Sequence, residues 1–251
     1  LAGLAVFAMH GQWRHAPAEQ RPRPDKPIQR FRPVLSDPIA RRLLIISVVN
    51  AAPVAVTSTL FLFFVDSRLG APDWAGPLLL LFFLSAAGSA PIWGRLAARY
   101  GGKPVLLSAM AIAIAAFGWA LALGTGDLAG FALICVVSGA AMAADMTLLP
   151  ALFAQRLAQL HQGGESAAFG LWSFAAKLSL ALAAAALLPA LQAAGYRVGA
   201  ENDPTALWAL SLLYAGLPCV LKLIAVALVL RSDISTAAPS PLVATMNRKA
   251  F

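Results

Sequence analysis

The stretch AAFGLWSFAAKLSLALAAAALLPALQAAG, from Ala167 to Gly195, decides the fold class. Residues 167–193 are long and apolar enough to cross a bilayer, because a membrane helix needs about 20 such residues. Lys177 is the only charged residue in this run. An ammonium group near the middle of the hydrocarbon is costly, so we expect Lys177 to face a partner, a cavity or water. Lys177 is therefore the first candidate for a functional residue.

The composition of the whole chain indicates an integral membrane protein. The 251 residues are 60% hydrophobic and 12% charged, about half the charged fraction of a typical soluble domain. The apolar residues form long blocks rather than alternating, which favours helices over a barrel. The basic residues that give the net charge of +8 lie mostly between these blocks and form no basic stripe, so nucleic-acid binding is not expected. Cys135 and Cys219 lie within apolar blocks and are expected to be buried, reduced thiols.

Six apolar blocks are predicted to span the membrane and to form a bundle over residues 39–231. The blocks are residues 40–64, 75–98, 104–123, 128–154, 167–193 and 206–230. Residues 1–9 are apolar but too short to span, and we interpret them as the tail of a truncated preceding helix. Residues 10–38 are a basic linker rich in proline and arginine, too polar to fold alone. Residues 232–251 are expected to be a disordered tail.

The positions of lysine and arginine predict the orientation. Of the 19 such residues, Lys177 and Lys222 lie within blocks, and only Arg68 and Arg197 lie in the connections on one side. The other fifteen lie in the linker, at the ends of the blocks on its side, in the connections on that side and in the tail. Because basic residues remain cytoplasmic, we predict a multi-pass protein of the inner (plasma) membrane with a cytoplasmic linker and C-terminus. An even number of spans agrees with this orientation.

Four polar side chains from four blocks are predicted to share one depth. At about 1.5 Å per residue, Asn50, Asp145, Lys177 and Lys222 all lie roughly 12 to 15 Å from the cytoplasmic end. We interpret Asp145 and Lys177 as residues of a central cavity that bind a polar substrate or change partners during transport. The alternative is an ion pair that only holds two helices together. Lys222 is expected to snorkel toward the cytoplasmic interface near Arg231.

Two further features have a functional and a plain interpretation. Trp172, close to Lys177 in sequence, either stacks on a sugar ring or packs against neighbouring helices. The turn GRLAARYGGK, from Gly94 to Lys103, is either a functional motif or an ordinary basic cytoplasmic turn. The sequence has no nucleotide-binding glycine loop, no paired His and Glu at metal spacing and no serine elbow. We therefore expect no enzyme, no catalytic residues, no metal and no organic cofactor.

The turn resembles the cytoplasmic loop motif of the major facilitator superfamily. The matching residues are Gly94, Arg99, Gly101 and Lys103. The acidic residue that usually precedes the basic one is Ala98 here, so the sequence departs from the motif at that position.

Two longer stretches resemble the glycoside–pentoside–hexuronide:cation symporters, the melibiose permease family. FGLWSFAAK, from Phe169 to Lys177, looks like helix eleven of that family, and GAAMAADMTLLPALFAQ, from Gly139, is similar to helix ten. Asn50 lies where helix seven often carries asparagine. Lys177 matches the family lysine near the cation and sugar sites.

The resemblance covers about residues 37–231 and implies the C-terminal six-helix half of a transporter whose N-terminal half precedes Leu1. It implies symport of a sugar, glycoside or similar polar solute with Na⁺ or H⁺ by alternating access, and inverted three-helix repeats within the half. One alternative is transport of an amphiphile such as a lysolipid. Another, from a different class, is a non-transporting membrane scaffold or receptor.

Overall fold

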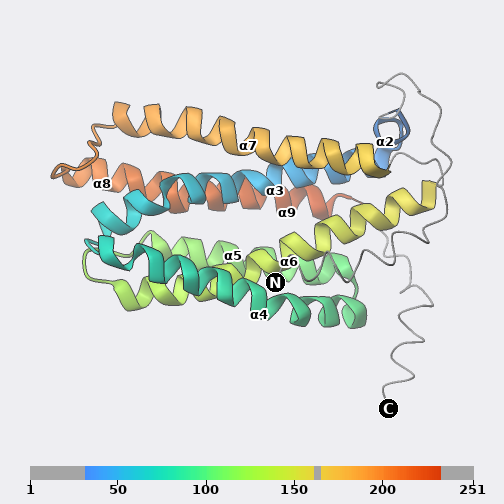
Figure 1. Cartoon of the computed structure of the whole chain (residues 1–251), viewed down its shortest axis with the longest axis horizontal. Helices are drawn as coiled ribbons and strands as arrows, with labels where there is room; N and C mark the ends of the chain where they lie inside the picture. Colours follow the sequence, from blue (N-terminus) through green and yellow to red (C-terminus); the bar gives the residue numbers. More distant parts are fainter. Residues whose placement is uncertain (1–31, 161–164, 233–251) are drawn as a thin grey trace, which may run out of the picture.

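The computed structural model describes residues 32–160 and 165–232, which form an all-helical bundle (Figure 1). In chain order the elements are α2 (Arg32–Ser36), α3 (Pro38–Phe63), the π-helical turn η2 (Phe64–Arg68), the short 3-10 helix η3 (Pro72–Trp74), α4 (Ala75–Tyr100), α5 (Gly102–Ala120), α6 (Leu128–Leu160), α7 (Glu165–Ala193), α8 (Pro204–Ser211), the π-helical turn η4 (Leu212–Gly216) and α9 (Leu217–Leu230). Six helical stretches of the described residues are long and apolar enough to cross a membrane. The prediction of six spans is therefore confirmed.

The helix boundaries differ from the predicted ones at a few places. α6 continues to Leu160, beyond the predicted end at residue 154, because Gln, Arg, Leu and Ala continue the chain there and all favour a helix. Within the predicted linker, residues 32–36 form α2, and the apolar Val34 packs into the core. The predicted helix tail of residues 1–9, most of the linker and nearly all of the C-terminal tail lie outside the described residues.

The helices form two layers, and the main contacts in one layer correspond to those in the other. In Figure 1, α3, α7 and the α8–α9 stretch lie in the upper layer, and α4, α5 and α6 lie in the lower layer. α3 packs mainly against α7 and α9, and α6 packs mainly against α4 and α5. Exchanging α3 with α6, α4 with α7 and α5 with α9 maps these main contacts onto one another, although the contact between α4 and α5 has no comparable counterpart between α7 and α9. This is the contact pattern of an inverted three-helix repeat.

Contacts between connections show which helix ends lie together. At one end, here called the linker end, Arg156 after the membrane part of α6 contacts Asp37 before α3, and Lys103 contacts Ser232 after α9. At the opposite end, Ser67 and Tyr196 share a hydrogen bond of 2.7 Å. The spans therefore alternate in direction. The linker end is the one that the basic residues predict to be cytoplasmic.

Two apolar clusters fill the bundle and leave its middle to polar groups. The cluster toward the opposite end includes the stacked rings of Phe64 and Tyr214, whose centroids are 4.3 Å apart. The cluster toward the linker end includes Leu43, Leu106 and Phe153. At the junction of these clusters lie the buried residues Asn50, Asp145 and Lys222. α4 and α7 are the least buried of the six spans.

Candidate functional site

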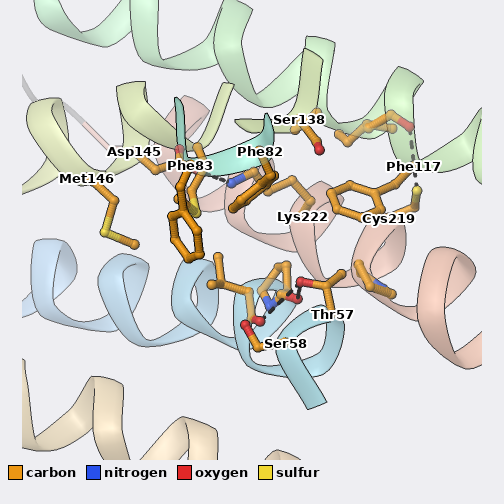
Figure 2. Close-up of a pocket in the computed structure, with 16 residues that line it drawn as sticks. Thr57, Ser58, Phe82, Phe83, Phe117, Ser138, Asp145, Met146, Cys219 and Lys222 are labelled. Carbon is orange, nitrogen blue, oxygen red and sulfur yellow. Dashed lines mark hydrogen bonds and ion pairs between the residues drawn. The ribbon is translucent and has the colours of Figure 1, made fainter. Parts of the chain in front are cut away.

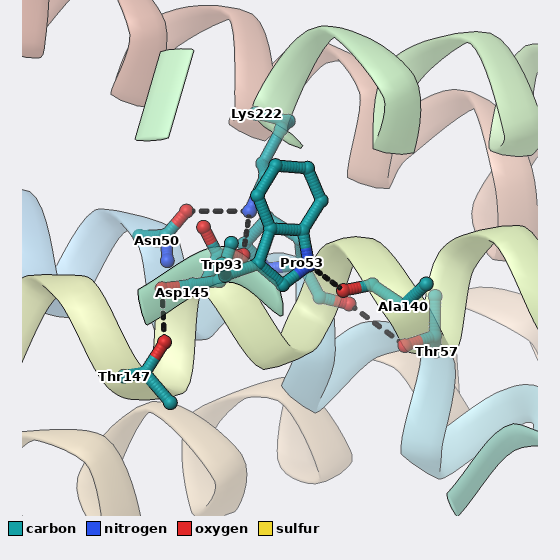
Figure 3. Close-up of polar contacts among 9 residues, drawn as sticks. Asn50, Pro53, Thr57, Trp93, Ala140, Asp145, Thr147 and Lys222 are labelled. Atoms are coloured by element: carbon teal, nitrogen blue, oxygen red, sulfur yellow. Dashed lines mark hydrogen bonds and ion pairs between the residues drawn. The ribbon is translucent and has the colours of Figure 1, made fainter. Parts of the chain in front are cut away.

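A buried polar network joins three helices at the junction of the two clusters. It consists of Asn50 on α3, Asp145 on α6 and Lys222 on α9, which are 4%, 4% and 5% exposed. Lys222 Nζ donates a hydrogen bond of 2.6 Å to Asn50 Oδ1 and forms an ion pair with Asp145 Oδ2 (Figure 3). Such a pair adds little net stability, because desolvation offsets most of the attraction. Breaking it by removing one partner is strongly destabilising.

One atom of this network has no partner. Asp145 Oδ1 is the only buried side-chain nitrogen or oxygen, among the residues that the structure describes, without a hydrogen bond. A buried carboxylate oxygen left in this way is unfavourable, since nearly all buried polar atoms in proteins are paired. The network is therefore able to gain stability from a proton, an ion or a ligand group that reaches this carboxylate.

Asp145 and Lys222 of this network line a cavity of about 350 Å³ at the middle of the bundle, whereas Asn50 lies behind them and does not line it. The other lining residues are mostly apolar: Pro53, Val54, Phe82, Phe83, Ala113, Ile114, Phe117, Met142, Met146 and Pro218. Polar atoms come from Thr57, Ser58, Ser138 and Cys219 (Figure 2). A cavity of this size and character is typical of sites for small molecules.

The two prolines in the cavity wall leave the local backbone irregular. Pro53 on α3 and Pro218 on α9 each lack the N–H that a helix interior normally donates. Thr57 Oγ1 donates to the carbonyl of Pro53 at 3.1 Å, so this hydroxyl is satisfied within its own helix. The π-helical turn η4 directly precedes Pro218. Pro53 and Pro218 therefore place weakened helical backbone beside the network.

The cavity wall formed by α4 and α6 is held together by close contacts between these two helices. Ser85 Oγ donates to the carbonyl of Val136 at 2.6 Å, and Trp93 Nε1 donates to the carbonyl of Ala140 at 2.7 Å (Figure 3). Gly139 lets the helices approach so closely that a Cβ there would lie 2.3 Å from the carbonyl oxygen of Phe82. Small residues allow this kind of close backbone packing in membranes. In this cavity wall, α4 with Phe82 and α6 with Asp145 are thus packed tightly together.

Lys177 does not join the network: of the two residues predicted to line the cavity, Asp145 does and Lys177 does not, and the alternative, an ion pair between them, is not formed either. Lys177 is exposed on α7, beside Phe174 and Leu178, which are 62% and 44% exposed. Asp145 pairs with Lys222 instead. α7 packs mainly on α3 and scarcely touches α6, so its middle does not reach Asp145.

The prediction that Lys222 snorkels is also wrong, because its ammonium is buried between Asn50 and Asp145. Sequence reasoning therefore missed the cation of the site. The signal was available: Lys222 shares its predicted depth with Asn50 and Asp145, and their agreement was more informative than its distance from Arg231.

Trp172 and the loop residues occupy packing and capping positions. The Trp172 ring lies 5.0 Å from the Phe153 ring and does not line the cavity. Gly101 has φ +92°, which suits glycine at the turn between α4 and α5. Lys103 Nζ donates to the carbonyls of Leu230 at 3.2 Å and Ser232 at 2.7 Å, where a cation stabilises the end of α9.

The other two residues of the loop stretch lie on the surface. Arg99 lies over the Tyr100 ring, with its guanidinium carbon 5.3 Å from the centroid. Gly94 is exposed, and a Cβ at Gly94 would meet no atom within 4 Å. The roles predicted for these positions from the loop motif stay predictions.

Within residues 32–160 and 165–232, no group of three or more His, Cys, Asp or Glu side chains is arranged to hold a metal ion. Cys135 and Cys219 are free thiols. In a comparison with protein families, the family described as MFS/sugar transport protein matches residues 1–236. A search of curated proteins gives no match.

Proposed function

The chain belongs to the major facilitator superfamily of membrane transporters, and from this premise we propose that it takes part in secondary active transport as a cation-coupled symporter. In this proposal a solute and a cation, Na⁺ or H⁺, cross together by alternating access. The chain contributes one six-helix half, and a second half preceding Leu1 contributes the other wall of the route. The protein lies in the inner (plasma) membrane with its C-terminus in the cytoplasm.

The observation that carries this proposal is the buried pair of Asp145 and Lys222 on the wall of a cavity, with Asn50 bound to Lys222. Charged groups inside a membrane domain are expensive and are functional by default. A carboxylate with one unpartnered oxygen is a group that a cation can neutralise. A closed scaffold would need neither the cavity nor the unpartnered oxygen.

The solute in the first form of the proposal is a sugar, a glycoside or a similar polar molecule. The description of the matching family names sugar transport. Phe82, Phe83 and Phe117 offer ring faces on which the apolar face of a sugar can stack. Ser58 and Ser138 offer hydroxyl groups for hydrogen bonds with sugar hydroxyls.

An amphiphile such as a lysolipid is the second candidate solute. The specific observation in its favour is the lining of the cavity, in which Phe82, Phe83, Met142 and Met146 provide far more apolar than polar surface. An amphiphile places its chain against such side chains and its head group near Asp145 and Lys222.

Lys177 and Trp172 keep a role in this proposal as residues of the surface between the two halves. Lys177 is exposed in the middle of α7, which with α4 is the least buried span. A lysine at that depth needs a partner or water, and a second bundle against α7 supplies one. Trp172 sets the position of α7 by packing on Phe153.

The test is uptake by the full-length protein in liposomes. Radiolabelled glycosides and lysolipids are offered with an imposed Na⁺ gradient, an imposed pH gradient or neither. We expect accumulation of one class that depends on a gradient and is lost in Asp145→Asn. The matched control is Asp73→Asn, which changes an exposed aspartate outside the cavity. Uptake that is indifferent to both gradients, or equal in Asp145→Asn, would refute cation coupling at this site.

A further inference from the structure

We propose that the hydroxyl group of Ser138 is a subsite that binds a single uncharged hydroxyl group of the solute, at a distance from Asp145 and Lys222. The solute is then an elongated molecule with polar groups at both ends of an apolar body. The inference rests on the proposed function and deepens it, because it names the residue that selects the solute and the chemistry that this residue selects.

Ser138 differs in its hydrogen bonding from the other buried serines of the described residues. Ser47, Ser211 and Ser232 each donate to a carbonyl of their own helix three or four residues earlier, at 2.8, 3.1 and 2.7 Å. A hydroxyl group in a membrane helix commonly bonds in this way, because lipid offers it no other partner. Ser138, which is 5% exposed, makes no hydrogen bond within the part of the chain that the structure describes.

The hydroxyl group of Ser138 is open to the cavity. Unlike Asp145 Oδ1, its oxygen is not enclosed by protein atoms, and Ser138 lines the cavity (Figure 2). A hydroxyl group left without a hydrogen bond in an apolar space is unfavourable. A hydroxyl group of a bound solute removes this penalty, because it can accept a hydrogen bond from Ser138 and donate one to it.

Contacts between α4 and α6 fix the position of Ser138. The carbonyl of Val136 accepts from Ser85 Oγ at 2.6 Å, and the carbonyl of Ala140 accepts from Trp93 Nε1 at 2.7 Å. These two carbonyls lie on either side of Ser138 in the chain. A hydroxyl group held in this way discriminates between solutes, because it cannot shift to reach a misplaced partner.

The surroundings of Ser138 indicate that its partner is uncharged. Phe82 packs against the next residue, Gly139. The two charged residues of the cavity lining, Asp145 and Lys222, pair with each other. An ionised group beside Ser138 would therefore lack a counter-charge in a largely apolar space, which is costly. A hydroxyl group needs no counter-charge.

The spacing of polar residues on α6 indicates the length of the solute. Ser138 and Asp145 are seven residues apart, so they lie on one face of the helix, about 10 Å apart along its axis. Met142 lies between them on this face and lines the cavity. A single sugar ring is too short to reach both. A glycoside with a hydroxyl group on its aglycone and an amphiphile with a hydroxyl group on its chain share the required chemistry, and the test separates them.

The test measures equilibrium binding of radiolabelled compounds to the full-length protein in lipid nanodiscs. Each compound with a hydroxyl group is paired with one that carries a methyl group in its place: 4-hydroxyphenyl glucoside with 4-methylphenyl glucoside, and 6-hydroxyhexyl phosphocholine with heptyl phosphocholine. In at least one pair, we expect the hydroxyl compound to bind on the order of tenfold more tightly. The pair that shows this preference identifies the solute as a glycoside or an amphiphile.

Variants assign the preference to its residue. Ser138→Ala removes only the hydroxyl group, so it should bind both members of the pair about equally. The matched control is Ser47→Ala, a change at a buried serine that does not line the cavity, and it should keep the wild-type preference. If thermal unfolding shows that Ser138→Ala does not fold, Ser138→Cys replaces it. Its thiol donates only weakly and should also lose most of the preference.

Three results would overturn the inference: methyl compounds that bind to the wild type as well as the hydroxyl compounds in both pairs, a hydroxyl preference that the Ser138 variant retains, or no binding of any of these compounds. Failure of the proposed function looks different. Binding that is selective for the hydroxyl group and depends on Ser138, without gradient-driven uptake into liposomes, would retain this subsite and reject transport. Gradient-driven uptake at equal rates for both members of each pair would retain transport and reject the subsite.

Discussion

Asp37, the residue before α3, makes contacts with two helices. Its Oδ1 accepts the backbone N–H of Ala40 at 2.7 Å, which caps α3. Arg156 on α6 donates to both carboxylate oxygens, from Nε at 3.1 Å and from Nη2 at 2.6 Å. These hydrogen bonds from Arg156 lower the pKa of Asp37, and they outweigh the opposing effect of its partial burial.

The lowered pKa of Asp37 predicts a pH-dependent contribution to stability. Because the folded protein favours the ionised form, the contribution is complete above the unfolded pKa of about 4 and is lost as the pH falls through the lower folded value. We expect Asp37→Asn to reduce the free energy of unfolding by up to about 1 kcal/mol at neutral pH, because asparagine keeps the helix cap and loses only the ion pair with Arg156. Thermal unfolding in detergent measures this, with Asp73→Asn as control. A deficit that stays equal well below pH 4 would contradict the prediction.

The residues of the site could be predicted from the sequence only in part. Asn50 and Asp145 stand out because they are polar within apolar runs, and a common depth relates them to Lys222. The sequence pattern does not show which face of its helix each residue occupies. α7 is apolar around its whole circumference, so no periodicity places Lys177 inward or outward. Tertiary packing decides that Lys222 is buried and Lys177 exposed.

At the scale of elements, the close approach of α4 and α6 depends on Gly139. We expect Gly139→Ala to reduce the free energy of unfolding by about 1 to 3 kcal/mol, since the new Cβ would lie 2.3 Å from the backbone oxygen of Phe82. The matched control is Gly88→Ala on α4, where a Cβ would meet no atom within 4 Å. The measurement is thermal unfolding of both variants in the same detergent. Equal stability of the two variants would show that the helices separate without cost.

The elements themselves were largely predictable. Six long apolar blocks, each bounded by glycine, proline or charged residues, give the six spans, because lipid leaves a helix as the only way to satisfy such backbone. The ends were less predictable, as α2 and the extension of α6 to Leu160 show. α2 depends on a contact that no local pattern contains, because Val34 packs into the core. The extension of α6 follows residues that favour a helix, and Arg156 on it binds Asp37.

At the scale of the whole molecule, the exposed Lys177 tests whether α7 works against a second bundle. We expect Lys177→Ala in the full-length protein to abolish gradient-driven uptake while expression and thermal stability persist, because the side chain is exposed on the surface of this half. Ser173→Ala, a change at another exposed residue of α7, is the control. Uptake by liposomes and unfolding in detergent are measured on the same preparations. Unchanged uptake would remove Lys177 from the translocation machinery.

The inverted repeat could not be read from the sequence. α3 and α6 occupy equivalent places in the exchange, yet one is flanked by the polar linker and the other continues past the membrane to Leu160. Their side chains differ at the centre as well, with Asn50 on one and Asp145 on the other. The symmetry belongs to the packing of the backbones and becomes visible only when the contacts between helices are known.

The Lys222–Asp145 pair has an electrical consequence. Moving one elementary charge fully across a membrane changes the energy by about 2.3 kcal/mol for each 100 mV of potential. Opposite charges fixed side by side contribute no net work when the bundle tilts, because the field acts on them in opposite directions. The membrane potential therefore does no net work on this ion pair when the bundle tilts.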